Sequence, residues 1–233
     1  MIRAAMNHWI YAFGWHFARY VTRQCVDFHL LNDDRLHRHG PFLLACTHLS
    51  HLEPFVLSPV VDRPIHWLSR TEHYAFPPIA RILDLCGAIP IKRDRRSVRA
   101  IRTSVERLRD GKVVGIFPEG GVMLGNSAAI RGGPIKRGAC TIALLAGVPI
   151  VPVVMVGTDK LNAIEPWLPG RLARVWGNVG PDLNPCDFLA PGRPRLSNLR
   201  RARLAMADAL VGRFIDTFEE LVTTCNLDRR RIP

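Results

Sequence analysis

The chain has 233 residues, which corresponds to one large domain or two small ones. Its 32 Lys and Arg against 20 Asp and Glu give a formal net charge of +12, while 48% of its residues are hydrophobic. This composition excludes a disordered tail and indicates a packed core with a basic surface for an anionic partner, either a nucleic acid or a phospholipid membrane.

The first 20 residues concentrate aromatic side chains, and arginines flank them. No small-residue cleavage site follows, so a signal peptide is not expected. Trp and Tyr favour the headgroup region of a bilayer and Arg favours anionic lipid, so we expect residues 1–30 to form a helical segment at the membrane interface. A helix buried against the domain is the alternative. The residues concerned are Trp9, Tyr11, Phe13, Trp15, Phe17 and Tyr20, with Arg3, Arg19 and Arg23.

Apolar strands alternate with amphipathic helices along the rest of the chain. This alternation predicts a single α/β domain over residues 31–233, with a central, largely parallel mixed sheet flanked by helices. The expected strands are Gly40–Cys46, Ile65–Ser69, Ala88–Ile91, Val113–Phe117, Ile150–Val156 and Leu172–Val179, and the expected helices are Ser97–Asp110, Gly138–Ala146 and Asn198–Thr223.

The uncharged run from Gly138 to Thr158 is long enough to cross a bilayer. A glycine and two prolines interrupt it, and its second half is β-branched. We therefore expect a short helix followed by a buried strand instead of a membrane span.

The six cysteines are spread along the chain without paired spacing, and no Cys-x-x-Cys sequence is present. A disulfide framework would be denser than this. We expect reduced thiols in a cytosolic protein.

In parallel α/β sheets the ligand crevice lies beyond the carboxyl ends of the strands. Polar and charged residues follow the predicted strands that end at Cys46, Ile91, Phe117 and Val156. The functional residues are therefore expected in these four connections.

His48 and Glu53 form a His-x4-acid pair just beyond the first of these strands. Imidazole titrates near neutral pH, and a carboxylate can fix its tautomer, so the pair suits general-base catalysis. A second pair, His29 and Asp34, has the same spacing, but it lies beside a polar turn and no buried strand precedes it. We expect that second pair to lie in a surface loop.

Two other kinds of site are not supported. A metal site formed by His48, His51 and Glu53 matches none of the common zinc spacings, and we expect neither a metal nor a cofactor. A serine hydrolase is unsupported because the chain has no Gly-x-Ser-x-Gly sequence.

Four segments together resemble the glycerolipid acyltransferase family, typified by bacterial 1-acylglycerol-3-phosphate acyltransferases. They occur in the order of the family's four sequence blocks and cover about half the chain, from Phe42 to Asp159. The segments are Thr47-His-Leu-Ser-His-Leu-Glu-Pro54, Gly87-Ala-Ile-Pro-Ile-Lys-Arg93, Phe117-Pro-Glu-Gly120 and Val148-Pro-Ile-Val-Pro-Val153.

The resemblance implies a reaction. His48 takes the proton of an acceptor hydroxyl, which attacks the thioester carbonyl of acyl-CoA or acyl-carrier protein, and Glu53 orients His48. The implied acceptor is a lysophospholipid, 1-acylglycerol-3-phosphate first of all. The implied location is the cytoplasmic face of the inner membrane, with peripheral or monotopic attachment to anionic phospholipid.

The resemblance also implies residues that bind the acceptor. Arg93, Glu119 and Gly120 shape the site for its phosphate and glycerol, and Lys136 is a further phosphate candidate before a predicted helix. A solvated basic face is the alternative interpretation of Arg93 and Lys136.

Two positions depart from the family pattern. Glu53 stands where the family usually has Asp, and Gly121-Val-Met123 replaces Thr-Arg-Ser, which removes a phosphate-facing arginine. Arg131 or Arg137 is a candidate substitute.

Three alternatives follow from these departures and from the charge. In the first, the acceptor is a lyso-lipid without phosphate, or the protein is a transacylase. In the second, the protein is an inactive family member that serves as a lipid-binding scaffold. In the third, it is a non-catalytic basic protein that binds membrane or nucleic acid. We expect no nucleic acid partner, because the aromatic residues are not interleaved with the arginine clusters.

Overall fold

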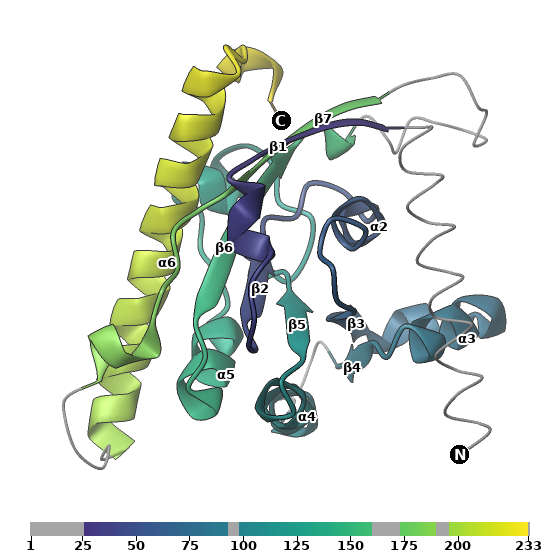
Figure 1. The fold of residues 1–233 in the computed structure, drawn as a ribbon, viewed down its shortest axis with the longest axis vertical. Coiled ribbons are helices and arrows are strands. Elements are labelled where there is room, and N and C mark those ends of the chain that lie inside the picture. The colour runs from purple at the N-terminus through teal and green to yellow at the C-terminus, as the bar shows by residue number, and fades with distance from the viewer. Residues whose placement is uncertain (1–25, 93–97, 160–172, 190–195, 233) are drawn as a thin grey trace.

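A computed structural model of the protein describes residues 26–92, 98–159, 173–189 and 196–232. Within these residues one mixed sheet forms the centre, with the strand order β1-β7-β6-β2-β5-β3-β4 (Figure 1). The strands are β1 (Val26–Leu31), β2 (Leu43–Cys46), β3 (Ile65–Arg70), β4 (Ile89–Ile91), β5 (Val113–Ile116), β6 (Ile150–Val156) and β7 (Ala173–Val179). The α-helices are α2 (Glu53–Leu57), α3 (Pro77–Leu85), α4 (Val98–Arg109), α5 (Gly138–Ala146) and α6 (Leu196–Thr224), and short 3-10 helices include η1 (Asp33–Leu36), η2 (Thr71–Ala75) and η4 (Ala129–Arg131).

The strands at the centre of the sheet all run in one direction. β6, β2, β5, β3 and β4 are parallel to one another, whereas β7 pairs antiparallel with β6 and β1 pairs parallel with β7. The expected α/β domain with a largely parallel mixed sheet is confirmed. Because neighbouring parallel strands end at the same edge, the residues that follow β6, β2, β5 and β3 are brought together.

Both faces of the sheet are buried, because alternate residues of each strand point to opposite sides. Leu43 and Ala45 of β2 join a cluster with residues of α4, α5 and α6. Leu44 and Cys46 join a second cluster with Val56 and other residues of α2 on the opposite side (Figure 1). Strand β2 is therefore packed on both faces, and the connection to α2 begins at its end.

Several predicted elements agree closely with the structure. Helix Gly138–Ala146 and strand Ile150–Val156 have the expected bounds, and α4 and α6 begin and end within two residues of the expected positions. The expectation that the uncharged run from Gly138 forms a short helix and a buried strand, and not a membrane span, is confirmed by α5 and β6. Helices α2 and α3 were not predicted: α2 has five residues, and α3 begins with prolines.

The predicted boundary at residue 30 is wrong. Residues 26–31, assigned from the sequence largely to the N-terminal helical segment, form strand β1 at the edge of the sheet. Val26, Phe28 and Leu30 alternate with the polar residues Asp27 and His29, which is a strand pattern that the sequence interpretation overlooked. Their partner strand β7 lies far along the chain. The remaining aromatic segment, residues 1–25, lies outside the described residues.

Helix α3 exposes an apolar stripe. None of the α3 residues is buried: Ile79 and Ile82 are 45% and 51% exposed, and Phe76, the N-cap residue directly before the helix, is 59% exposed. The three-residue spacing of Ile79 and Ile82 places them on one side of the helix. No helix within the described ranges has the length and apolar character needed to cross a membrane.

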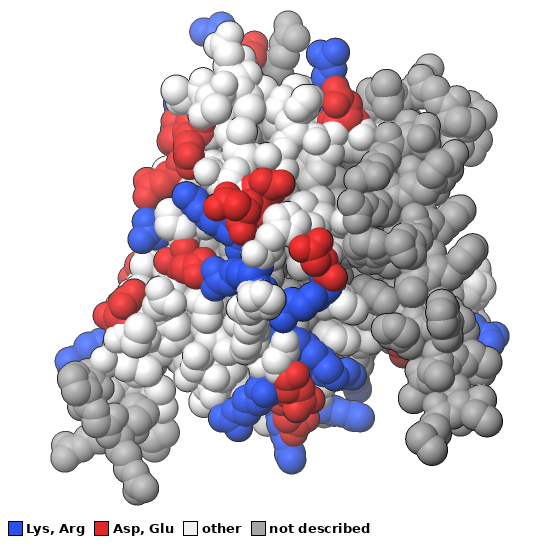
Figure 2. Space-filling view, viewed as in Figure 1, with Lys and Arg blue, Asp and Glu red and all other residues white. Residues whose placement is uncertain are grey.

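Charge is distributed unevenly on the face shown in Figure 2. Lys and Arg gather at its lower edge, in the region of α4, and acidic side chains are interspersed above (Figure 2). On α4 itself, Arg99, Arg102 and Arg109 are exposed, and Arg102 pairs with Glu106 at 2.9 Å. This face therefore carries local basic clusters and not one continuous basic surface.

Candidate active site

His48 is the second residue after β2, and its backbone is held on both sides. Its N–H donates to Glu119 Oε2 at 2.6 Å, and its carbonyl oxygen accepts from the N–H of Met123 at 3.1 Å. Thr47, directly before it, donates its N–H to the Val153 carbonyl of β6 at 3.1 Å. The connections after β5 and the strand β6 therefore fix where the His48 side chain begins.

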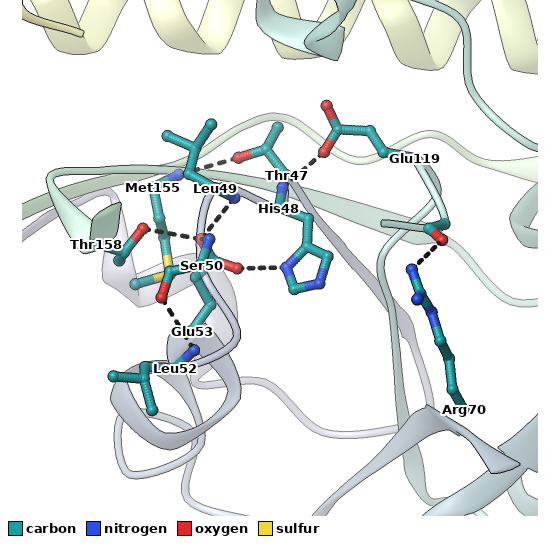
Figure 3. A network of polar contacts seen from close by, with 11 residues as sticks. Thr47, His48, Leu49, Ser50, Leu52, Glu53, Arg70, Glu119, Met155 and Thr158 are labelled. Atoms are coloured by element: carbon teal, nitrogen blue, oxygen red, sulfur yellow. Dashed lines mark hydrogen bonds and ion pairs between the residues drawn. The ribbon is translucent and has the colours of Figure 1, made fainter. Parts of the chain in front are cut away.

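The His48 imidazole contacts a buried carboxylate. Its Nδ1 lies 2.6 Å from Glu53 Oε2, and Glu53 has no exposed surface (Figure 3). Because a carboxylate accepts hydrogen bonds, the hydrogen lies on Nδ1, and Nε2 presents a lone pair on the side of the ring away from Glu53. The side chain of His48 keeps 11% of its surface exposed. This is the arrangement of a general base that a reacting hydroxyl can reach.

The second oxygen of Glu53 accepts three hydrogen bonds. The N–H groups of Leu49 and Ser50 each lie 2.7 Å from Oε1, and the Thr158 hydroxyl donates to it at 2.8 Å (Figure 3). Thr158 is fully buried and follows β6. A glutamate therefore reaches His48 from the first turn of α2, and the methylene it adds to the family's usual aspartate does not break the pair.

Glu119 is a second buried carboxylate beside His48. Besides the His48 N–H, it accepts the N–H of Ala129 at 2.7 Å. Burial raises the pKa of Glu119 above its ordinary value, and the Glu53 carboxylate raises it further, while the two N–H groups and the His48 ring lower it. Both oxygens of Glu119 therefore accept backbone hydrogen bonds of the site, and its expected part in shaping the site for the acceptor stays a prediction.

Two cationic side chains meet at Gly120. Arg70, the last residue of β3, donates from Nη2 to the Gly120 carbonyl at 2.9 Å (Figure 3). A Cβ at Gly120 would lie 2.5 Å from Lys136 Nζ, so the Lys136 ammonium group rests against this glycine. Gly120 also has a φ of +73°, which favours glycine. Sequence reasoning missed Arg70, although it ends a strand at the edge where functional residues were expected.

Arg131 donates to the carbonyl oxygen of Ile232 in the C-terminal segment at 3.0 Å, and its expected contact with the acceptor stays a prediction. Arg137 is the N-cap residue of α5 and is exposed. Arg93 lies outside the described residues, so its expected contact with the acceptor stays a prediction.

The second His-x4-acid pair, His29 and Asp34, does not form a contact like that of His48 with Glu53. His29 lies on edge strand β1 and its Nε2 pairs with Asp27 at 3.2 Å, with 58% of its side chain exposed. Asp34 belongs to η1. The expectation that this pair lies at the surface is confirmed, although His29 is in a strand and not a loop.

Two further histidines lie near this site, His51 beside His48 and His73 beside His51. The rings of His48 and His51 lie 5.5 Å apart, and those of His51 and His73 lie 6.2 Å apart. Burial lowers the pKa of His51, and the neighbouring His48, His73 and Arg70 lower it further. Among the described residues, no group of three His, Cys, Asp or Glu side chains is arranged to hold a metal ion.

A carboxylate-oriented imidazole lies at the carboxyl edge of a parallel α/β sheet, where enzymes of this architecture place their ligand sites. Comparison with known protein families identifies the family to which the chain belongs. Residues 27–156 match the family model described as acyltransferase, so the chain belongs to the acyltransferase family.

Named relatives extend this result. The chain is 28% identical to the 1-acyl-sn-glycerol-3-phosphate acyltransferase of Bacillus subtilis over 73% of its own length and 81% of the relative. It is 32% identical to a chloroplastic 1-acyl-sn-glycerol-3-phosphate acyltransferase of Brassica napus over 52% of the chain and 34% of the relative.

A solved structure shows the same fold. The 1-acyl-sn-glycerophosphate (LPA) acyltransferase PlsC of Thermotoga maritima matches with a TM-score of 0.63 at 19% identity, covering 90% of this chain and 81% of that one.

Replacement of Thr158 tests whether its hydrogen bond to Glu53 contributes to the reaction. Thr158→Val removes a donor from Glu53 at nearly constant volume and frees the carboxylate to move relative to His48. We expect kcat for acyl transfer to fall about tenfold, since a hydrogen bond to a charged group contributes about 1.5–3 kcal/mol and about 1.4 kcal/mol corresponds to tenfold. Thr158→Ser retains the donor and should keep most of kcat. Equal turnover by the Val and Ser variants would contradict this assignment.

Proposed function

We propose that the protein transfers a fatty acyl group from acyl-CoA or acyl-carrier protein to the free hydroxyl of a lysophospholipid, with 1-acyl-sn-glycerol-3-phosphate as the acceptor. The observation that carries the proposal is the His48–Glu53 pair, 2.6 Å apart, with Nε2 left to meet a hydroxyl. Membership of the acyltransferase family and the names of the relatives support the same reaction.

In the proposed reaction the acceptor hydroxyl gives its proton to His48 Nε2. The oxygen then attacks the thioester carbonyl carbon, the carbon–sulfur bond breaks, and the proton passes to the departing thiolate. Glu53 keeps the Nδ1 hydrogen in place and balances the charge of the imidazolium. General-base catalysis of this kind contributes about 10²–10⁴-fold to the rate.

Replacement of His48 tests the mechanism. His48→Ala should lower kcat for acyl transfer to 1-acyl-sn-glycerol-3-phosphate at least about 10²-fold, because it removes the base. Transfer is measured from radiolabelled acyl-CoA and, separately, from acyl-carrier protein. His29→Ala is the matched control, since His29 lies exposed on β1. Near-wild-type turnover by a folded His48→Ala variant would refute the mechanism.

We infer that Arg70 and Lys136 bind the phosphate of the acceptor. Both are held at Gly120, on the connection that also carries Glu119 and thus faces His48. The guanidinium of Arg70 spends one N–H on the Gly120 carbonyl and has further donors for phosphate oxygens. Arg70 thereby supplies a cation where Gly121-Val-Met123 lacks the family's arginine.

A comparison of acceptors tests this assignment. Arg70→Ala should raise KM for 1-acyl-sn-glycerol-3-phosphate about tenfold or more, since a charge-assisted hydrogen bond contributes about 1.5–3 kcal/mol. KM for monoacylglycerol, which has no phosphate, should not change. Arg102→Ala on α4 is the control, because that side chain is 80% exposed. Equal effects of Arg70→Ala on both acceptors would exclude phosphate binding by Arg70 and favour an acceptor without phosphate.

We propose that the protein associates peripherally with anionic phospholipid at the cytoplasmic face of the inner membrane, with α3 in contact with the bilayer. Helix α3 follows η2, whose His73 lies beside His51 and thus near His48, so the apolar stripe of α3 adjoins the rim of the site. The cysteines among the described residues are free thiols, which fits a reducing compartment.

Variants of the apolar stripe test this contact. Phe76→Ser/Ile79→Ser should weaken co-sedimentation with phosphatidylglycerol-containing vesicles at least about tenfold, because each buried side chain contributes about 1.5–3 kcal/mol. Leu145→Ser is the matched control: Leu145 is 46% exposed near the C-terminal end of α5, and so near the opposite end of the sheet from His48. Unchanged vesicle binding by the double variant would show that another surface, such as residues 1–25, carries the association.

A further inference from the structure

Three aromatic rings form a continuous stack that ends at His48. The Phe117 ring lies 4.2 Å from the His48 imidazole, centroid to centroid, with 26° between their planes. Trp67 in turn stacks with Phe117 at 4.9 Å and 13°. Trp67 belongs to β3 and Phe117 follows β5, so the stack connects the imidazole to the interior of the sheet.

Trp67 is fixed in place by its surroundings. Its indole N–H donates to the Ser58 hydroxyl at the end of α2 at 2.9 Å, and only 9% of the residue is exposed. Its neighbour across the β3–β5 pair is Gly115. A Cβ at Gly115 would lie 2.4 Å from Trp67 Cε3, so the indole occupies the space that a side chain would fill.

The hydrogen bond from Nδ1 to Glu53 holds one edge of the imidazole but leaves the ring free to rotate about that contact. Stacking against Phe117 fixes the ring plane and so the direction of the Nε2 lone pair. The direction of this lone pair therefore depends on where Phe117 lies, and Trp67 sets that position.

We propose that Trp67 and Gly115 are positioning residues for His48, acting through Phe117. Gly115 provides the space for the indole, the indole fixes the Phe117 ring, and that ring fixes the imidazole. The inference rests on the proposed function, in which His48 is the general base. No conformational demand explains the glycine, because the φ of Gly115 is not in the left-handed region.

Gly115→Ala tests the space beneath the indole. The added methyl displaces Trp67, and we expect kcat to fall about tenfold to a hundredfold, the order of loss that small misplacements of catalytic groups produce, while KM for both substrates stays within about twofold. Gly212→Ala is the matched control, because that glycine lies in α6 with nothing within 4 Å of an added Cβ. Wild-type kcat in Gly115→Ala would overturn the proposal.

Substitutions of Trp67 test the ring itself. Trp67→Leu should lower kcat as Gly115→Ala does, and Trp67→Phe, which retains a flat ring, should recover most of the loss. The double variant Gly115→Ala/Trp67→Leu should be no slower than the slower single variant, because both changes act on one contact. Independent, multiplying losses would overturn the common route through Phe117.

A spectroscopic measurement separates this inference from the proposed function. In protein with ¹³C-labelled histidine, ring currents from Phe117 shift the His48 ring protons upfield, and His48→Ala identifies their signals. Gly115→Ala and Trp67→Leu should move these signals towards ordinary histidine positions even if no acyl transfer is detected. Unmoved signals would overturn the positioning role, whereas absence of acyl transfer in the wild-type protein would overturn only the proposed function.

Discussion

The Glu53 carboxylate holds the site together because it collects four hydrogen-bond donors in a place that water does not reach. One oxygen accepts from the imidazole of His48, and the other accepts from two backbone N–H groups and the hydroxyl of Thr158. A buried carboxylate is costly unless its lone pairs are satisfied, and here the donors come from the loop after β2 and from the end of β6. The carboxylate therefore connects His48, the loop after β2 and the end of β6.

A second carboxylate extends this organisation to β5. Glu119 accepts the N–H of His48 with one oxygen and that of Ala129 with the other, so it ties the loop after β5 to His48. The same loop brings Gly120, and with it Arg70 and Lys136, to the rim of the site. Backbone contacts thus hold His48 close to the loop that carries Gly120, where Arg70 donates and the Lys136 side chain lies. This arrangement fits the proposed reaction, which must align a hydroxyl with a base and a phosphate with cations.

The basic residues behind the net charge of +12 lie in different places in the fold. Arg70 and Lys136 are cations placed at the site, whereas the exposed arginines of α4 lie on the surface and one of them is paired with Glu106. The apolar stripe of α3 adjoins the same rim as Arg70. A basic site beside an exposed apolar stripe fits the proposed substrate, an anionic headgroup attached to an acyl chain, better than it fits a nucleic acid.

The sequence by itself determined the α/β class, the bounds of α5 and β6, and the pair of His48 with Glu53. Each of these depends on local order: hydrophobic periodicity sets helices and strands, and a spacing of five residues is closed by one loop. Only the tertiary structure showed that Thr158 donates to Glu53, that Arg70 donates to Gly120 and that Trp67 stacks on Phe117. It also showed that both oxygens of Glu119 accept backbone hydrogen bonds. Thr158 lies 105 residues from Glu53, and the edge strand β1 finds its partner in β7 across most of the chain. Such contacts are set by which strands become neighbours in the sheet, and strand order depends on packing of the whole domain and not on any local pattern.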